Sequence, residues 1–137
     1  MTDGATVRRY VPRTTGLHRD FYLHTLAGGL HLQACEDCGE RQHPPRYYCR
    51  ACRSKALSFK AATGTGTIYS FTVSHFTHDP GWAAAAPFGT VVVETDEGPR
   101  IVASWLGAND DIRIGTRVRI VIEPVNEAFG MLQAEAL

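Results

Sequence analysis

All four cysteines of the 137-residue chain lie in one stretch, CEDCGERQHPPRYYCRAC, at residues 35–52. They form two C-x-x-C pairs, Cys35 with Cys38 and Cys49 with Cys52, and ten residues separate the pairs. Each pair makes a tight turn that can direct two thiolates at one ion, and the spacing between the pairs suits a short hairpin. We therefore predict one tetrahedral site with four sulfur ligands.

The sulfur ligands favour zinc over other metals. Iron is the alternative, because a rubredoxin-like site offers it the same sulfur geometry. Redox-active thiols and disulfides are further alternatives, but the paired spacing and the lack of a secretion signal disfavour both. Four protein ligands leave no coordination position for water or substrate, so we expect the zinc to be structural rather than hydrolytic.

Basic side chains surround the two cysteine pairs: Arg41, Arg46, Arg50, Arg53 and Lys55. In one interpretation they compensate the net negative charge of four thiolates on a divalent ion. In the other, some of them bind the phosphates of an anionic ligand, since guanidinium groups pair well with phosphate. Arg46, Arg50 and Arg53 are the candidate contacts in this second interpretation. Between the pairs, His43 is expected at the surface rather than as a fifth ligand.

A short helix is predicted before the first cysteine, over residues 20–27, because a Gly-Gly pair follows it and a strand at 30–34 leads into Cys35. A helix this short is unstable alone and must dock on something. Its bulky side chains, Phe21 and Tyr22 among them, either pack on the chain itself or contact a partner or an apolar ligand. Both alternatives stay open at this point.

The remaining residues alternate as β-strands do. We predict five strands: a long one at 65–77, a hairpin of 88–95 and 100–106 around the turn Asp96–Pro99, a strand ended by Pro124 and a last strand at 130–137. A polar stretch at 107–115 separates the third strand from the fourth and contains a short helical turn. The fold class is therefore mainly β, and five strands fit the Greek-key barrel called the OB-fold, with an SH3-like barrel as the alternative.

Length and composition are those of an ordinary globular chain, with 44% hydrophobic and 20% charged residues. We divide it into an N-terminal arm and short helix (1–29), a zinc ribbon (30–60) and a barrel (61–137). Residues 1–60 carry ten Lys and Arg against five Asp and Glu, a net charge of +5, whereas residues 61–137 carry four against nine, a net charge of −5. No membrane span or signal peptide is evident, so we expect a soluble, cytoplasmic protein.

The connection HDPGWAAAAP at residues 78–87 is unusually apolar for a solvated loop. Trp82 and four alanines give it this character. The loop either covers one end of the barrel or contacts a partner protein or an acyl group, and we take Trp82 as the candidate contact residue.

Several of these segments together resemble the DUF35 family. The resemblance begins at Asp20 and rests on CxxCG, on PPR before the third cysteine, on the second CxxC, on GTGTIYSFT at 64–72 and on DEGPR at 96–100. The second pair departs from the family, which commonly has proline where this chain has Arg50. Members of the family pair an N-terminal helix and a rubredoxin-like zinc ribbon with an OB-fold.

The resemblance implies that the chain acts together with acyl-CoA enzymes. Members accompany thiolases and thiolase-like aldolases, including those of steroid side-chain degradation, or are fused to hydratase-type subunits. The expected function is thus a non-catalytic accessory or scaffold subunit of a thiolase-like acyl-CoA enzyme, in a hetero-oligomer that handles acyl-CoA. Partnership with a MaoC-like enoyl-CoA hydratase is the alternative.

The residues themselves offer little catalytic chemistry. The sequence has no GxSxG elbow, phosphate loop or dinucleotide glycine pattern, and the cysteines are assigned to metal. His75, His78 and Asp79 form an acid-base cluster, which we interpret as solvated side chains at a strand end. Single-stranded nucleic acid is an alternative ligand for an OB-fold, but it requires a basic groove with stacking aromatics. The barrel segment is net negative, so we expect no nucleic-acid partner.

Overall fold

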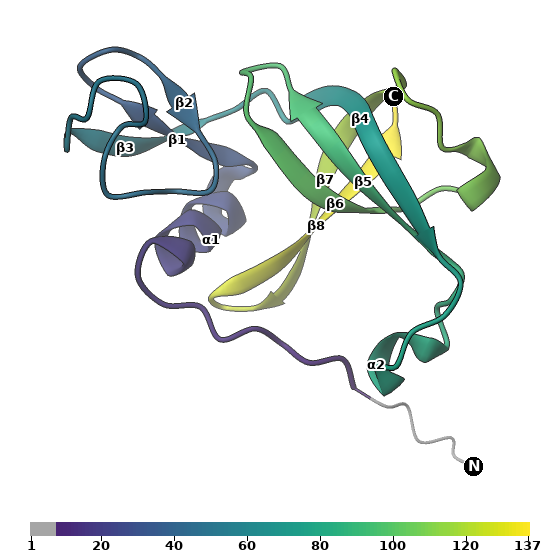
Figure 1. The fold of residues 1–137 in the computed structure, drawn as a ribbon. Coiled ribbons are helices and arrows are strands. Elements are labelled where there is room, and N and C mark those ends of the chain that lie inside the picture. Colours follow the sequence, from purple (N-terminus) through teal and green to yellow (C-terminus); the bar gives the residue numbers. More distant parts are fainter. Residues whose placement is uncertain (1–7) are drawn as a thin grey trace.

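A computed structural model describes residues 8–137, and residues 1–7, part of the predicted N-terminal arm, lie outside the described residues. Figure 1 shows a small sheet and a barrel side by side. The elements in chain order are α1 (Gly16–Gly28), β1 (His31–Cys35), β2 (Arg41–Gln42), β3 (Leu57–Ala61), β4 (Thr65–Ser74), α2 (Pro80–Ala83), β5 (Phe88–Thr95), β6 (Arg100–Trp105), the 3-10 helix η1 (Asn109–Asp111), β7 (Arg117–Asn126) and β8 (Phe129–Ala136). Among the described residues, no helix is both long and apolar enough to cross a membrane.

The strands form two sheets. The first, here called the ribbon, has the order β2-β1-β3 with antiparallel neighbours. The second is a closed barrel with the order β4-β5-β6-β8-β7, in which only β6 and β8 run parallel. The five barrel strands thus follow the order first, second, third, fifth, fourth and back to the first, as in an OB-fold. The predicted mainly β fold with an OB-fold barrel is confirmed.

The predicted alternation places the barrel core correctly. Val91, Val93, Ile101 and Val118 are at most 1% exposed and point into the barrel. Two strand ends were predicted wrongly. The first barrel strand ends at Ser74 rather than near residue 77.

Pro124 does not end the fourth barrel strand, because β7 continues to Asn126. Pro124 pairs with Gly130, and the ladder shifts register between Pro124 and Asn126. Proline is tolerated beside such an irregularity, since the backbone there need not donate a regular ladder hydrogen bond.

Helix α1 begins at Gly16, four residues before the predicted start at residue 20. The preceding N-cap residue, Thr15, is extended and is of a type that often caps helices, although its side chain makes no capping hydrogen bond here. Phe21 is 2% exposed, and its ring centroid lies 4.9 Å from that of His43 in the ribbon. The Tyr22 ring lies 4.8 Å from Phe129 in β8. The helix therefore docks on its own chain and joins the ribbon to the barrel.

The chain before α1, residues 8–15, runs along the underside of the barrel toward α2 (Figure 1). We call this segment the arm. The Thr14 hydroxyl donates to the Ala128 carbonyl in the β7–β8 turn at 2.9 Å. At the other end, Arg9 Nε donates to the Gly81 carbonyl at 3.2 Å, and the guanidinium carbon lies 3.7 Å from the centre of the Trp82 ring. The arm thus connects two loops at one end of the barrel.

Candidate metal centre and neighbouring surfaces

The four cysteines converge at the tip of the ribbon. Their sulfur atoms all lie within 4.8 Å of one another. Cys35 Sγ is 3.6 Å from Cys52 Sγ, and Cys38 Sγ is 3.5 Å from Cys49 Sγ. Zinc–sulfur bonds of about 2.3 Å would give tetrahedron edges of about 3.8 Å, so the spacing fits a four-thiolate zinc ion.

The two C-x-x-C turns repeat one hydrogen-bonding pattern. In the first, Gly39 N–H donates to the Cys35 carbonyl at 2.9 Å and Cys35 N–H donates to the Glu40 carbonyl at 2.9 Å. In the second, Arg53 N–H donates to the Cys49 carbonyl at 2.9 Å, and Cys49 N–H donates to the Ser54 carbonyl at 2.8 Å. Both turns therefore present their sulfurs in the same way.

The last position of each turn requires a left-handed backbone. Gly39 occupies it in the first turn with φ of 79°, and Arg53 in the second with φ of 68°. Glycine adopts this conformation freely, whereas a side chain with a Cβ does so at a cost. Arg53 is thus placed by the geometry of the turn, and its side chain is exposed at the ribbon tip.

The backbone amides of the two turns favour the thiolate form of one cysteine in each pair. Hydrogen bonding from the Cys38 backbone lowers the pKa of Cys35, and hydrogen bonding from the Cys52 and Ala51 backbones lowers the pKa of Cys49 to about 7. The N–H groups of Ala51 and Cys52 lie 3.4 and 3.5 Å from Cys49 Sγ. Since only a thiolate binds zinc, these amides prepare Cys35 and Cys49 for the metal. The neighbouring Cys49 sulfur raises the pKa of Cys38, and burial and the Cys35 sulfur raise the pKa of Cys52.

Two buried amides, Gln33 and Gln42, organise the segment between the cysteine pairs. Each side chain is 3% exposed, and Gln42 Nε2 donates to Gln33 Oε1 at 2.7 Å. Gln33 Oε1 also accepts from Arg46 N–H at 2.8 Å, and Gln33 Nε2 donates to the Arg46 carbonyl at 2.9 Å. Gln42 Oε1 accepts from Arg50 N–H at 2.9 Å. The pair therefore fixes the backbone at both arginines.

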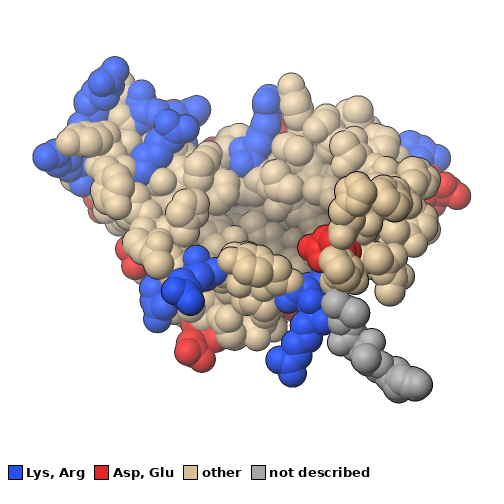
Figure 2. All heavy atoms as spheres, turned by 60° about the horizontal axis from the view of Figure 1, so that its bottom comes forward, with Lys and Arg blue, Asp and Glu red and all other residues tan. Residues whose placement is uncertain are grey.

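The basic residues of the ribbon do not act as one group. Arg46 and Arg50 line a cleft beside the barrel, whereas Arg53 does not line it. The Lys55 ammonium lies 5.3 Å from the centre of the Tyr48 ring. Figure 2 shows Lys and Arg gathered over the ribbon, at the left of the view. His43, expected at the surface, is instead largely covered because Phe21 packs against its ring.

Acidic neighbours offset part of this positive charge. Arg50 Nε lies 2.7 Å from Glu40 Oε2, and Lys60 Nζ lies 2.9 Å from Glu36 Oε1. The hydrogen bond from Lys60 lowers the pKa of Glu36. These pairs are solvent-exposed, so each contributes little to stability.

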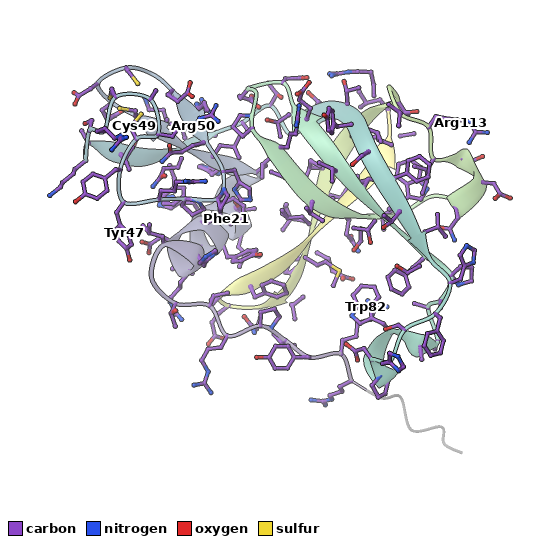
Figure 3. The ribbon with its side chains drawn as sticks, viewed as in Figure 1. Phe21, Tyr47, Cys49, Arg50, Trp82 and Arg113 are labelled. Carbon is purple, nitrogen blue, oxygen red and sulfur yellow. The ribbon has the colours of Figure 1, made fainter. Side chains whose placement is uncertain are left out.

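Trp82 lies in α2, half-buried beside the barrel (Figure 3). Its ring centroid is 4.9 Å from that of Phe88, and Arg9 covers it from the arm. Trp82 and Arg9 are among the residues around a hollow of about 370 Å³, which also includes Trp105 and Met131. We call this hollow the lower groove, and Figure 2 shows the underside hollowed between the ribbon side and α2.

The acid-base cluster of the sequence is not assembled into a site. Asp79 caps α2, and its Oδ1 accepts from Gly81 N–H at 2.8 Å. The His78 ring packs edge-on against Phe76, with centroids 4.9 Å apart, and Phe76 is 75% exposed. These residues lie on an open surface.

Sequence reasoning missed three residues that shape these surfaces. Gln33 and Gln42 carry no local signal, because glutamine is usually exposed. The sequence pattern places Arg100 in the hairpin and assigns it no contact, yet it lines the cleft opposite Arg46 and Arg50. Its position depends on how the ribbon packs beside the barrel, which no spacing in the sequence reports.

Two family models match the chain. The model described as the ChsH2 rubredoxin-like zinc ribbon domain matches residues 27–58, and the model described as the ChsH2 C-terminal OB-fold domain matches residues 59–123. Fold and site thus define a protein that joins a zinc ribbon to an OB-fold. A DUF35 domain-containing scaffold protein of Methanothermobacter thermautotrophicus is 33% identical over 129 residues, which are 93% of this chain and 86% of that protein. The chain belongs to the DUF35 family.

Two further proteins are similar. A probable enoyl-CoA hydratase alpha subunit of Thermomonospora curvata is 39% identical over 90 residues, which are 65% of this chain and 28% of that protein. The chain therefore spans less than a third of that relative. A solved structure described as the Ltp2-ChsH2(DUF35) aldolase superimposes with a TM-score of 0.82 at 27% identity, over 92% of this chain and 98% of that chain.

Proposed function

We propose that the chain is a non-catalytic accessory subunit of a thiolase-like acyl-CoA enzyme, which it helps to assemble. The observation that carries the proposal is the superposition on nearly the whole DUF35 chain of the Ltp2-ChsH2 aldolase. The scaffold description of the Methanothermobacter relative supports the same role. The open surface around His75, His78 and Asp79 also favours binding over catalysis, because a general base works in a site that positions a substrate.

We infer that Cys35, Cys38, Cys49 and Cys52 hold a structural zinc ion. The sulfur spacing and the two matched turns support this assignment. Bound zinc would connect the ends of the ribbon strands, and the ribbon would then hold its shape for a partner. Iron remains the alternative metal for the same four thiolates, and metal analysis of protein purified from its native host distinguishes the two.

We infer that the partner docks on Trp82 and the lower groove. An indole ring that is half-buried and flanked by Phe88 resembles the aromatic anchors of protein interfaces. We also infer a cytoplasmic location from the zinc assignment, because thiolates that bind metal persist in a reducing compartment.

The test uses a tagged chain purified from its native host, with the co-purifying protein identified by mass and the complex rebuilt from purified components. We expect a thiolase-like subunit. Trp82→Glu should abolish assembly while zinc content stays unchanged. The control Ile114→Glu alters a side chain that is 66% exposed outside the lower groove, and it should assemble normally. Normal assembly of Trp82→Glu would remove Trp82 from the interface.

A MaoC-like hydratase is the second candidate partner, and the name of the Thermomonospora relative favours it. Recovery of a hydratase instead of a thiolase-like protein would select this alternative. Nucleic-acid binding has less support, because the barrel segment is net negative. Tight binding of a single-stranded oligonucleotide that weakens steeply with salt would restore it.

A further inference from the structure

A cleft of about 430 Å³ separates the ribbon from the β5–β6 turn. Arg46 and Arg50 line it from the ribbon, and Arg100 lines it from the start of β6. Glu94 is the one carboxylate among its lining residues. Arg50 is labelled in Figure 3, at the edge of the ribbon next to the barrel. The cleft is thus positively charged although the chain as a whole has a formal net charge of zero.

The backbone of Arg46 and Arg50 and the side chain of Arg100 are held in place before any ligand arrives. Gln33 and Gln42 fix the backbone of Arg46 and Arg50 through buried hydrogen bonds. Arg100 stacks on Tyr69, with its guanidinium carbon 3.6 Å from the ring centre. Groups that are ordered in advance lose little entropy on binding, so they bind more tightly than mobile side chains.

The ion pairs of the cleft leave guanidinium nitrogens available. Arg50 bonds Glu40 through Nε at 2.7 Å, and Arg100 bonds Glu94 through Nε at 3.3 Å. Within residues 8–137, the terminal nitrogens of both side chains and the whole Arg46 guanidinium have no hydrogen-bond partner. A planar guanidinium presents such nitrogens in pairs that match phosphate oxygens.

His43 adds a neutral polar group to the same cleft. Its Nδ1 is buried and has no hydrogen-bond partner among the described residues. Burial, and then the nearby His18, lowers the pKa of His43 to about 4. The ring is therefore uncharged near pH 7 and adds no charge to the cleft.

An apolar groove continues from the cleft. His43 and Arg100 also line a hollow of about 390 Å³ between α1 and the barrel, whose other walls include Tyr22, Val102 and Leu132. Val102 is 61% exposed on the outer face of β6 and so contributes apolar surface to this hollow. A ligand with phosphate at one end and an apolar chain at the other matches both hollows.

We propose that the ribbon–barrel cleft binds the phosphate groups of a small amphiphilic ligand, whose apolar chain lies in the groove between α1 and the barrel. Arg46, Arg50 and Arg100 hold the phosphates. The identification of this ligand as an acyl-CoA rests on the proposed function, whereas the phosphate site itself does not. The proposal deepens the accessory role, because the subunit would hold the substrate as well as the partner.

Calorimetric titration of the zinc-loaded full chain tests the proposal with three probes: inorganic pyrophosphate, CoA and octanoyl-CoA. We expect affinity to rise in that order. Arg46→Gln and Arg100→Gln should each weaken all three by about tenfold, since each removes a charge-assisted hydrogen bond. Val102→Gln, which adds a polar group without charge, should weaken octanoyl-CoA by about tenfold and leave pyrophosphate unchanged.

Arg113→Gln is the charge-matched control, because Arg113 lies at the far end of the barrel from the ribbon (Figure 3). It should bind every probe like the wild type, and circular dichroism with zinc analysis confirms that each variant is folded. No binding of any probe, or an equal loss in Arg113→Gln, overturns the phosphate site. Equal affinity for CoA and octanoyl-CoA overturns the assignment of the apolar groove. Tighter binding of a single-stranded oligonucleotide than of octanoyl-CoA overturns the proposal that the ligand is a small molecule.

Partner assembly is a separate measurement. Arg46→Gln keeps Trp82 and the lower groove intact, so it should still form the complex with the partner. Loss of phosphate binding in Arg46→Gln with normal assembly therefore supports the cleft as the phosphate site. Failure of the wild-type chain to recover any partner contradicts the proposed function and leaves the phosphate site standing.

Discussion

The ribbon buries polar side chains beside apolar ones such as Leu32, whereas the interior of the barrel is almost entirely apolar. Buried side chains around β1 include Cys35 and the amide pair of Gln33 and Gln42, which are at most 3% exposed. In the barrel the corresponding positions carry aliphatic groups such as Ile101 and Val118, which are at most 1% exposed. Sulfur and amide groups need specific partners when they are buried, but aliphatic groups need only close packing.

This difference implies that the two regions fail in different ways. Each partner in the ribbon is specific, so removal of one leaves another polar group unsatisfied. The stability of the barrel comes from many apolar contacts, so a smaller core side chain lowers the free energy of unfolding without unfolding the barrel. The ribbon should therefore depend on metal and on single hydrogen bonds, while the barrel should respond gradually to core substitutions.

The largest effect is expected from loss of the metal. Cys49→Ser removes one thiolate ligand, and bound zinc contributes on the order of 10 kcal/mol to folding in small zinc domains. We expect zinc loss and collapse of the ribbon amide signals in NMR spectra, while the barrel signals persist. Ala51→Ser changes the same turn without touching a ligand and should keep the metal. An intact ribbon spectrum in metal-free Cys49→Ser would show that the comparison is wrong.

A smaller effect is expected in the barrel core. Ile101→Ala removes part of a side chain that is 1% exposed, and such changes lower the free energy of unfolding by about 3 kcal/mol. Urea unfolding followed by fluorescence measures the change, and zinc content should stay normal. The adjacent Val102→Ala should change stability by less than about 0.5 kcal/mol because that side chain is largely exposed.

The buried amide pair should give the next effect. Gln42→Leu, at similar side-chain volume, leaves Arg50 N–H and the Tyr48 carbonyl without their Gln42 partner and removes one of the two hydrogen bonds that Gln33 Oε1 accepts. We expect a loss of about 2 kcal/mol, the usual cost of buried unsatisfied polar groups. Hydrogen exchange of the amides at 46–50 should accelerate more than exchange in the barrel. Unchanged protection there would mean that the pair does not order this segment.

The smallest effect concerns Asp96, whose carboxylate accepts two hydrogen bonds from Arg117, at 2.7 and 3.0 Å, and one from Thr65. These bonds, first those from Arg117, hold the pKa of Asp96 well below its usual range. The ion pair therefore stabilises the fold above about pH 4, the ordinary pKa of aspartate, and its contribution is lost as the pH falls further.

Asp96→Asn should lower the free energy of unfolding at pH 7 by about 1 kcal/mol, because the pair is partly exposed. The difference from wild type should shrink between pH 4 and pH 2, as measured by parallel urea titrations. Glu135→Gln, which alters the more exposed pair with Arg119, serves as the control and should have a smaller effect. A difference that stays constant with pH would contradict the assigned role.

The sequence predicted the features that rest on local repetition. Cysteine spacing indicated the clustered sulfurs, and period-two alternation placed Val91, Ile101 and Val118 in the barrel. It did not predict features that depend on distant contacts. The cleft needs Arg100 beside Arg46, and these residues meet only because the ribbon packs next to the β5–β6 turn.

The start of α1 shows the same limit at short range. Thr15 is an N-cap residue type directly before the helix, but Gly16 follows it and disfavours a helix, so the start was predicted four residues too late. The amide pair of Gln33 and Gln42 also escaped prediction, because each residue alone has the composition of a surface position. The amide pair is satisfied only by groups that the fold brings together, which no single residue type reports.

The arm lies outside the residues that the family models match, yet it borders the groove beside Trp82. Arg9 rests on the indole ring, and Thr14 connects the arm to the opposite turn. Changes to a few residues upstream of α1 would therefore alter the shape and charge of this groove. Two relatives with the same ribbon and barrel would then present different grooves through their arms alone.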